Sequence, residues 1–200
     1  MASENLYLIK RSYMDLKDPN ETYFKVAILG TYTNLHAAKT ASKTILMTEG
    51  YDKSDFPKYE VNNGQDDWTH GDGVIVYAEG PSGEKFTVTI ETVPNTVGLE
   101  GDQDGKVSQQ LWHVLQTDVD YVSDRSGFKR ETFIEGSYMN YEDAKIRALT
   151  VLLDSDLDKK AYAEYTEYTD GTESPYGPDV IVHAAKENGE VYWVMVITSA

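Results

Sequence analysis

The sequence predicts an α+β protein made of two copies of one module, and three observations support this prediction. The chain of 200 residues matches itself at a shift of 106, which aligns residues 6–94 with residues 112–200 at about 21 identities in 89 positions. The apolar pattern of each copy indicates the same order of elements, β-β-α-β-β-β. The apolar content of 40% and the charged content of 26% are typical of a folded globular chain.

The identities cluster in two blocks that share one register. GTYTN at 30–34 aligns with GSYMN at 136–140, and VIVYA at 74–78 aligns with VIVHA at 180–184. Chance agreement would not hold one register through both blocks, so we infer a tandem duplication of a module of about 90 residues. A duplicated module often fixes in one chain what a twofold homodimer would assemble, and this predicts a pseudo-twofold arrangement.

The duplication also predicts the domain boundaries. We expect a first module at 1–95, an acidic glycine-rich linker at 96–110 and a second module at 111–200. The linker contains Glu100-x-Asp102-x-Asp104-Gly105, which imitates the first half of a calcium-binding EF-hand loop. That loop needs a bidentate carboxylate at its twelfth position, where Leu111 stands, so we interpret the segment as a solvated linker.

Each element of the module has its own sequence signal. Asn34 and Asn140 are good helix N-caps, and apolar residues recur at helical spacing after each of them, over 35–46 and 141–152. We therefore expect one helix packed on one face of a mostly antiparallel sheet in each copy. The predicted strands of the first copy are 6–13, 23–33, 58–61, 74–78 and 86–92. Those of the second copy are 112–122, 131–139, 163–169, 180–184 and 192–198.

Composition excludes several classes of function. The formal net charge of −16 would repel phosphate backbones and anionic lipids, so we expect neither a nucleic-acid partner nor a membrane partner. The sequence has no cysteine, which excludes disulfides, thiolate catalysis and iron–sulfur clusters. It shows no export signal and no apolar run of membrane-spanning length, which favours a cytoplasmic monomer or homodimer.

No motif with a known catalytic mechanism is present. The phosphate-binding glycine loops, the G-x-S-x-G nucleophile motif and the H-E-x-x-H zinc motif are all missing, so we predict no cofactor. The loop at 62–73 places Asp66, Asp67, His70 and Asp72 beside Trp68. Only Glu173 keeps a ligand-type side chain at the matching positions of the second copy, and we therefore interpret these residues as turn formers, with no metal site.

The histidines are more informative, because the 106-residue shift pairs three of the four with tyrosine. It aligns His70 with Tyr176, Tyr7 with His113, and Tyr77 with His183. Tyrosine and histidine both combine an aromatic ring with a polar tip, so packing explains the exchange in the simplest way. The sharper hypothesis places these rings in a cleft between the modules. The predicted ligand-binding residues are Tyr7, Tyr77, His113, His183, Trp68 and His70.

These observations favour a non-enzymatic binding or interaction protein with a small-molecule or protein partner. The alternative is a small cofactor-free enzyme, an isomerase, cyclase or lyase, that uses histidine and tyrosine as acid–base groups in the cleft between the modules.

Overall fold

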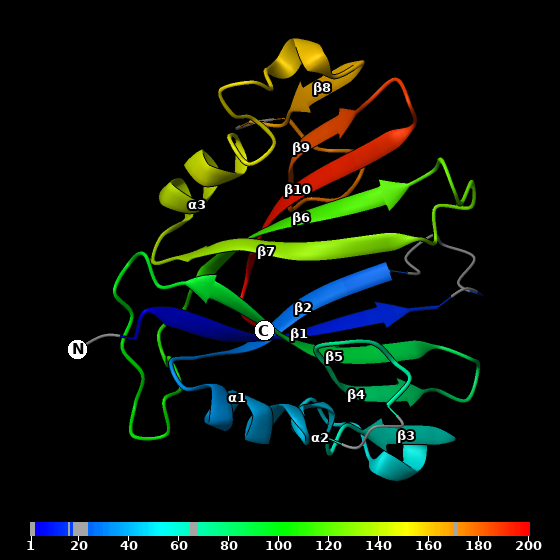
Figure 1. Cartoon of the computed structure of the whole chain (residues 1–200), viewed down its shortest axis with the longest axis vertical. Coiled ribbons are helices and arrows are strands. Elements are labelled where there is room, and N and C mark those ends of the chain that lie inside the picture. The colour runs from blue at the N-terminus through cyan, green and yellow to red at the C-terminus, as the bar shows by residue number, and fades with distance from the viewer. Residues whose placement is uncertain (1–2, 16, 18–23, 65–67, 170–171) are drawn as a thin grey trace. The chain divides into compact units, whose positions relative to one another are not determined.

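The protein folds as two similar halves. The computed structural model describes residues 3–15, 17, 24–64, 68–169 and 172–200. It divides the chain into two compact units, Met1–Ser108 with Ser199–Ala200, and Gln109–Thr198. Each unit contains a five-stranded antiparallel sheet with a helix packed on it (Figure 1), so the predicted α+β duplication is confirmed.

The first unit follows the predicted order of elements. Its sheet has the strand order β2-β1-β5-β4-β3, and all neighbouring strands are antiparallel. The strands are β1 (Asn5–Met14), β2 (Phe24–Tyr32), β3 (Lys58–Val61), β4 (Val74–Glu79) and β5 (Lys85–Pro94). The helices are α1 (Leu35–Ser42), α2 (Ile45–Thr48) and the short 3-10 helix η1 (Lys53–Asp55).

The second unit repeats this topology with the strand order β7-β6-β10-β9-β8, again antiparallel throughout. The strands are β6 (Trp112–Asp120), β7 (Arg130–Tyr138), β8 (Glu164–Glu167), β9 (Val180–Ala185) and β10 (Glu190–Thr198). The helices are α3 (Tyr141–Ala148) and the 3-10 helix η2 (Lys159–Ala161).

In each unit a hydrophobic core lies between the helix and one face of the sheet. Small residues of the helix make close packing possible: Ala38 in α1 and Ala144 and Ala148 in α3 are fully buried. In the first core they meet Ile9, Val76, Ala78 and Val88, and in the second core they meet Val114, Val182, Ala184 and Val194. Removing these side chains from water is the main stabilising contribution in both units.

The helices begin where the sequence predicts. The Asn34 side chain accepts a hydrogen bond from the Ala37 amide at 3.0 Å, and the Asn140 side chain accepts one from the Asp143 amide at 2.9 Å. Both helices end earlier than the apolar stripes. The backbone after α1 leaves the α-helical conformation at Thr44 (φ −123°), and α3 ends at Ala148. Leu46 and Leu152, beyond these ends, still reach the cores.

The first repeated block, GTYTN and GSYMN, contains a glycine followed two residues later by a tyrosine. Gly30 and Gly136 each adjoin a register shift at which their own strand carries one extra residue, Leu29 in β2 and Glu135 in β7. A Cβ atom at Gly30 would lie 3.0 Å from the ring of Tyr32, and one at Gly136 would lie 2.9 Å from the ring of Tyr138. The tyrosine ring therefore covers the glycine in both units and leaves no room for a side chain at that position.

The last hairpin of each unit contains the same tight turn, in which Gly83-Glu84 corresponds to Gly189-Glu190. Gly83 and Gly189 have φ angles of +95° and +93°, a region that glycine adopts without strain. Their amides donate to the carbonyl groups of Gly80 and Lys186 at 3.0 Å. The two hairpins therefore use the same turn geometry although only the Gly-Glu pair is shared.

The segment predicted as a linker at 96–110 makes specific contacts with the first unit. The Val107 amide donates to the Thr31 carbonyl at 2.9 Å, and the Thr33 amide donates to the Gly105 carbonyl at 2.8 Å. Leu99 and Val107 are buried. These residues of the segment are thus packed on the first unit instead of being solvated.

Candidate functional site

Three of the predicted site residues gather on the first sheet. The rings of His70 and Tyr77 stack with centroids 3.9 Å apart and planes 7° apart, and Trp68 meets His70 edge-on at 4.9 Å. His70 Nε2 is hydrogen-bonded to the Glu60 carboxylate. The Tyr77 hydroxyl donates to Glu79 Oε1 at 2.7 Å, and burial together with this carboxylate raises the Tyr77 pKa to about 12.

The second unit contains the same stack with histidine and tyrosine exchanged. Tyr176 stacks on His183 with centroids 4.3 Å apart, and it also stacks on Trp193 at 5.8 Å. His183 pairs with Trp193 across β9 and β10 exactly where Tyr77 pairs with Thr87 across β4 and β5. The sheet register therefore supports the exchange of Tyr77 with His183, and the common stacking supports the exchange of His70 with Tyr176.

The His183 ring is enclosed but incompletely paired. Its side chain is buried, and burial lowers the pKa of His183 although the Glu164 carboxylate acts in the opposite direction. The Nδ1 atom lies 3.5 Å from Glu164 Oε1 and has no hydrogen-bond partner among the described residues. The Arg130 guanidinium lies 4.8 Å from the Trp193 ring, so a cation covers the outer aromatic member of the stack.

The third exchange, of Tyr7 with His113, is wrong. Tyr7 pairs with Tyr32, and Trp112 pairs with Tyr138, so the structural equivalent of Tyr7 is Trp112 and that of His113 is Leu8. The shift is 105 residues for β1 and β6 and 106 for the other strands. A slip of one residue moves a strand side chain to the opposite face, which explains why the ungapped alignment misassigned these two rings.

His113 is instead a buried polar residue inside the second unit. It is fully buried, and its Nδ1 atom lies 2.9 Å from the Ser137 hydroxyl. Burial lowers the His113 pKa to about 4, so the ring is neutral at physiological pH. Thr117, Trp193 and His183 are paired neighbours on β6, β10 and β9. His113 lies four residues before Thr117 on β6, which separates it from this row by about 13 Å along the sheet. The shared cavity for His113 and His183 stays a prediction.

The acidic loop at 62–73 is described only in part. Asp66 and Asp67 lie outside the described residues, and Asp72 is exposed. Within the described ranges, no three histidine or acidic side chains are placed together as a metal site would require. The same part of the chain contains no helix with the length and apolar character needed to cross a membrane.

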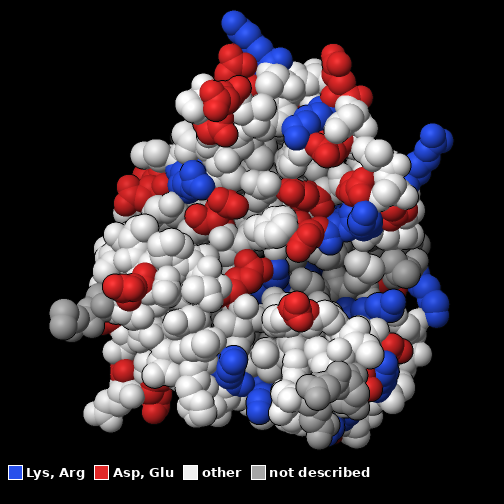
Figure 2. All heavy atoms as spheres, viewed as in Figure 1, with Lys and Arg blue, Asp and Glu red and all other residues white. Residues whose placement is uncertain are grey.

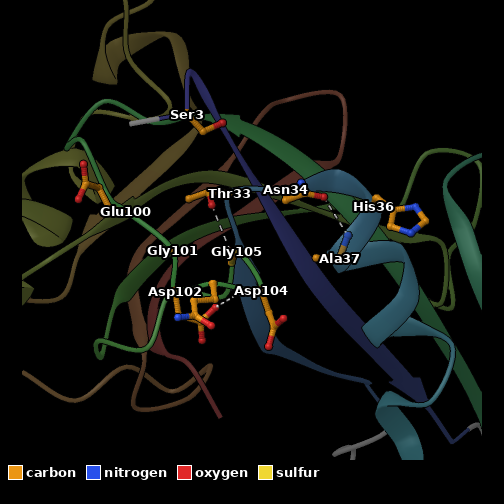
Figure 3. A pocket seen from close by; sticks show the side chains of 11 residues that line it. Ser3, Thr33, Asn34, His36, Ala37, Glu100, Gly101, Asp102, Asp104 and Gly105 are labelled. Carbon is orange, nitrogen blue, oxygen red and sulfur yellow. Dashed lines mark hydrogen bonds between the residues drawn. The ribbon is translucent and has the colours of Figure 1, made fainter. Parts of the chain in front are cut away.

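The first unit contains a cavity of about 560 Å³. Three chain segments form it: Ser3 before β1, the start of α1, and the loop at 100–105. Its lining side chains include the carboxylates of Glu100, Asp102 and Asp104. In Figure 3 the Asp102 and Asp104 side chains lie close together, whereas Glu100 and His36 point away from them in different directions.

Backbone hydrogen bonds fix the shape of the acidic loop. Asp102 Oδ1 accepts from the amides of Asp104 and Lys106, both at 2.9 Å. The Thr33 hydroxyl donates to the Gly105 carbonyl at 3.2 Å. A Cβ atom at Gly105 would come within 2.9 Å of Asn34 Cβ, so glycine is needed for this approach of the loop to α1. The loop thus holds its carboxylates in a defined position beside the start of α1.

Sequence reasoning missed this cavity. The spacing of the acids at 100, 102 and 104 was the available signal, and it indicated a loop with cation-ligand character. The pairing of residues 105–107 with the end of β2 was not visible, because contacts between segments more than 70 residues apart leave no local pattern.

In comparisons with known proteins, no family model, no curated protein and no solved structure matches the chain.

Proposed function

We propose that this protein is a non-enzymatic binding protein that takes a small organic cation in the cavity between the loop at 100–105 and the start of α1. One observation carries the proposal: the 560 Å³ cavity is lined by three carboxylates, with no lysine or arginine among its described lining residues. Cavities of 300–1,000 Å³ are the usual size for small-molecule sites.

The chemistry of the lining suits an ammonium group with further hydrogen-bonding groups. Carboxylates form short, strong hydrogen bonds with protonated amines. Ser3, Thr33 and Gln103 add hydroxyl and amide groups for the uncharged part of a ligand. The net charge of −16 raises the local concentration of cations around the protein, which favours their association.

The acid–base candidates give less support to the alternative of a cofactor-free enzyme. A general base is most effective with a pKa near the working pH. His113 is held neutral with a pKa of about 4, and His70 is bonded to Glu60 within an aromatic stack. These arrangements favour a packing role for the two rings.

Isothermal titration calorimetry with putrescine, spermidine and glucosamine as probes tests the proposal, with Ca²⁺ as a separate titrant. The double variant Asp102→Asn/Asp104→Asn keeps the Oδ1 acceptor that shapes the loop and removes two charges. The matched control Asp72→Asn/Asp156→Asn removes two charges from exposed positions outside this cavity.

We expect saturable binding of at least one amine, weakened at least tenfold in the cavity variant and less than twofold in the control. Equal weakening in both variants would show that net charge alone attracts the amine. Binding of Ca²⁺ without any amine would replace the organic cation by a metal ion, and no saturable binding of any probe would refute the site.

A further inference from the structure

A second cavity of the first unit has the opposite charge character. It has a volume of about 420 Å³ and lies between one face of α1 and the end of β3. Its lining residues are His36, Lys39, Thr40, Lys43, Asn62, Asn63, Gly64 and Ile75. No carboxylate occurs among the lining residues that the structure describes, although the chain has 34 acidic residues against 18 lysines and arginines.

Helix geometry brings the basic side chains together. Positions 39 and 40 lie three and four residues after position 36, and position 43 lies four and three residues after them, so their side chains share one face of the helix. Lys39 and Lys43 stand four residues apart, where like charges repel each other. Within the described ranges neither lysine forms an ion pair with a carboxylate. Figure 2 shows basic side chains together over the region of α1.

The opposite wall adds side-chain amide groups and an apolar side chain. The Asn62 side chain is anchored, because its Nδ2 atom donates to the Val74 carbonyl at 3.3 Å and its Oδ1 atom accepts from the Gly64 amide at 2.8 Å. Asn63 is exposed and contributes a further amide group to the lining. Ile75 gives the cavity an apolar surface beside these groups.

The second unit shows that the fold does not require this basic face. Asn34 and Asn140 are equivalent caps, so His36, Lys39, Thr40 and Lys43 correspond to Glu142, Lys145, Ile146 and Leu149. Of the three positions with a lysine or histidine only Lys39 is kept, as Lys145, whereas His36 and Lys43 are replaced by Glu142 and Leu149. The helix therefore folds and packs in the same way without them, and their presence in α1 needs another explanation.

The geometry points to a binding site for a small phosphate-bearing anion in this cavity. Two lysines supply positive charge, the His36 ring adds a hydrogen-bonding group, and lysine is a common point-charge ligand for phosphate. Asn62 and Asn63 face the same space, and Ile75 suits an apolar part of the ligand. This inference is independent of the proposed cation site, because the variants that test it leave Asp102 and Asp104 unchanged.

Nuclear magnetic resonance tests the inference with inorganic phosphate as the probe. Amide shifts of the ¹⁵N-labelled chain are followed during titration at pH 7, against sodium chloride at the same ionic strength. We expect saturable shifts at residues 36–43 and 62–64 with phosphate and not with chloride. Glycerol 3-phosphate, which offers an organic part to Ile75, should bind more tightly than inorganic phosphate.

Matched variants separate a built site from general charge. Lys39→Gln/Lys43→Gln should weaken phosphate binding at least tenfold, whereas Lys85→Gln/Lys160→Gln, which changes two exposed lysines elsewhere, should leave it within twofold. Unchanged helical circular dichroism would show that α1 remains folded. Shifts that do not saturate, or equal weakening in both double variants, would overturn the inference.

Discussion

Replacing His113 with leucine should remove a large part of the acid sensitivity of the second unit. The side chain is fully buried, and burial lowers its pKa from 6.5 to about 4. An unfolded histidine takes up its proton near pH 6.5, whereas the folded one does not until about pH 4. Stability contributed by the neutral ring is therefore present above pH 6.5 and is lost as the pH falls toward 4.

The size of the effect follows from this difference in pKa. Each pH unit between the two values costs about 1.36 kcal/mol, so the folded state loses roughly 3 kcal/mol between pH 6.5 and pH 4. His183, whose pKa is also lowered, contributes to the pH dependence of the free energy of unfolding in the wild type and in the variant alike. The difference between the two proteins therefore isolates His113.

The first unit indicates that leucine will be tolerated. Leu8 occupies the equivalent position and is fully buried opposite Thr31, whose hydroxyl has no hydrogen-bond partner among the described residues. His113→Leu would leave Ser137 in the same situation, at a cost of about 1–2 kcal/mol at pH 7. The variant should thus be less stable than the wild type at pH 7 and more stable at pH 4.5.

Urea unfolding between pH 7 and pH 4.5 measures this reversal. In a Trp68→Phe background the two remaining tryptophans, Trp112 and Trp193, both lie in the second unit, so their fluorescence reports on the unit that contains His113. A free-energy difference that stays constant over this pH range would refute the reasoning. So would a His113 ring that titrates near pH 6.5 by nuclear magnetic resonance.

Two further substitutions test the repeated structural features. Asn140→Ala removes the side chain that accepts from the Asp143 amide and should cost about 1 kcal/mol in urea unfolding, whereas an unchanged midpoint would contradict its role as a cap. Gly136→Ala forces a Cβ atom to within 2.9 Å of the Tyr138 ring and should cost about 1–3 kcal/mol in the same assay. Adding Tyr138→Ala to Gly136→Ala should recover part of that loss, and full additivity of the two changes would show that the ring does not cover the glycine.

Local signals in the sequence were sufficient for most of the fold. The continuous apolar, β-branched run in Val74–Glu79 and the cap at Asn34 act within a few residues of the chain, so the strand and the helix start could be predicted. The comparison of the two copies added support, because each predicted strand could be checked against the aligned residues of the other copy. The comparison failed at Tyr7 and His113, because the second copy has one residue more between its first two strands and an ungapped alignment therefore assigns these rings to the wrong strand face.

The candidate sites depended on contacts that the sequence does not display. Asp102 and Asp104 were visible as acids, but their position beside α1 requires the pairing of residues 105–107 with Thr31–Thr33. Lys39 and Lys43 were visible as helix residues, but the cavity they line requires Asn62 and Ile75 from the other side.

The sequence by itself determined the duplication, the order of elements and the helix caps, because propensity, periodicity and capping are properties of neighbouring residues. Only the tertiary structure decided that His70 stacks on Tyr77 and Tyr176 on His183, and that one acidic and one basic cavity flank α1. Such contacts form when strands and loops distant in the chain meet, and their free energy depends on distance and burial that no local pattern encodes.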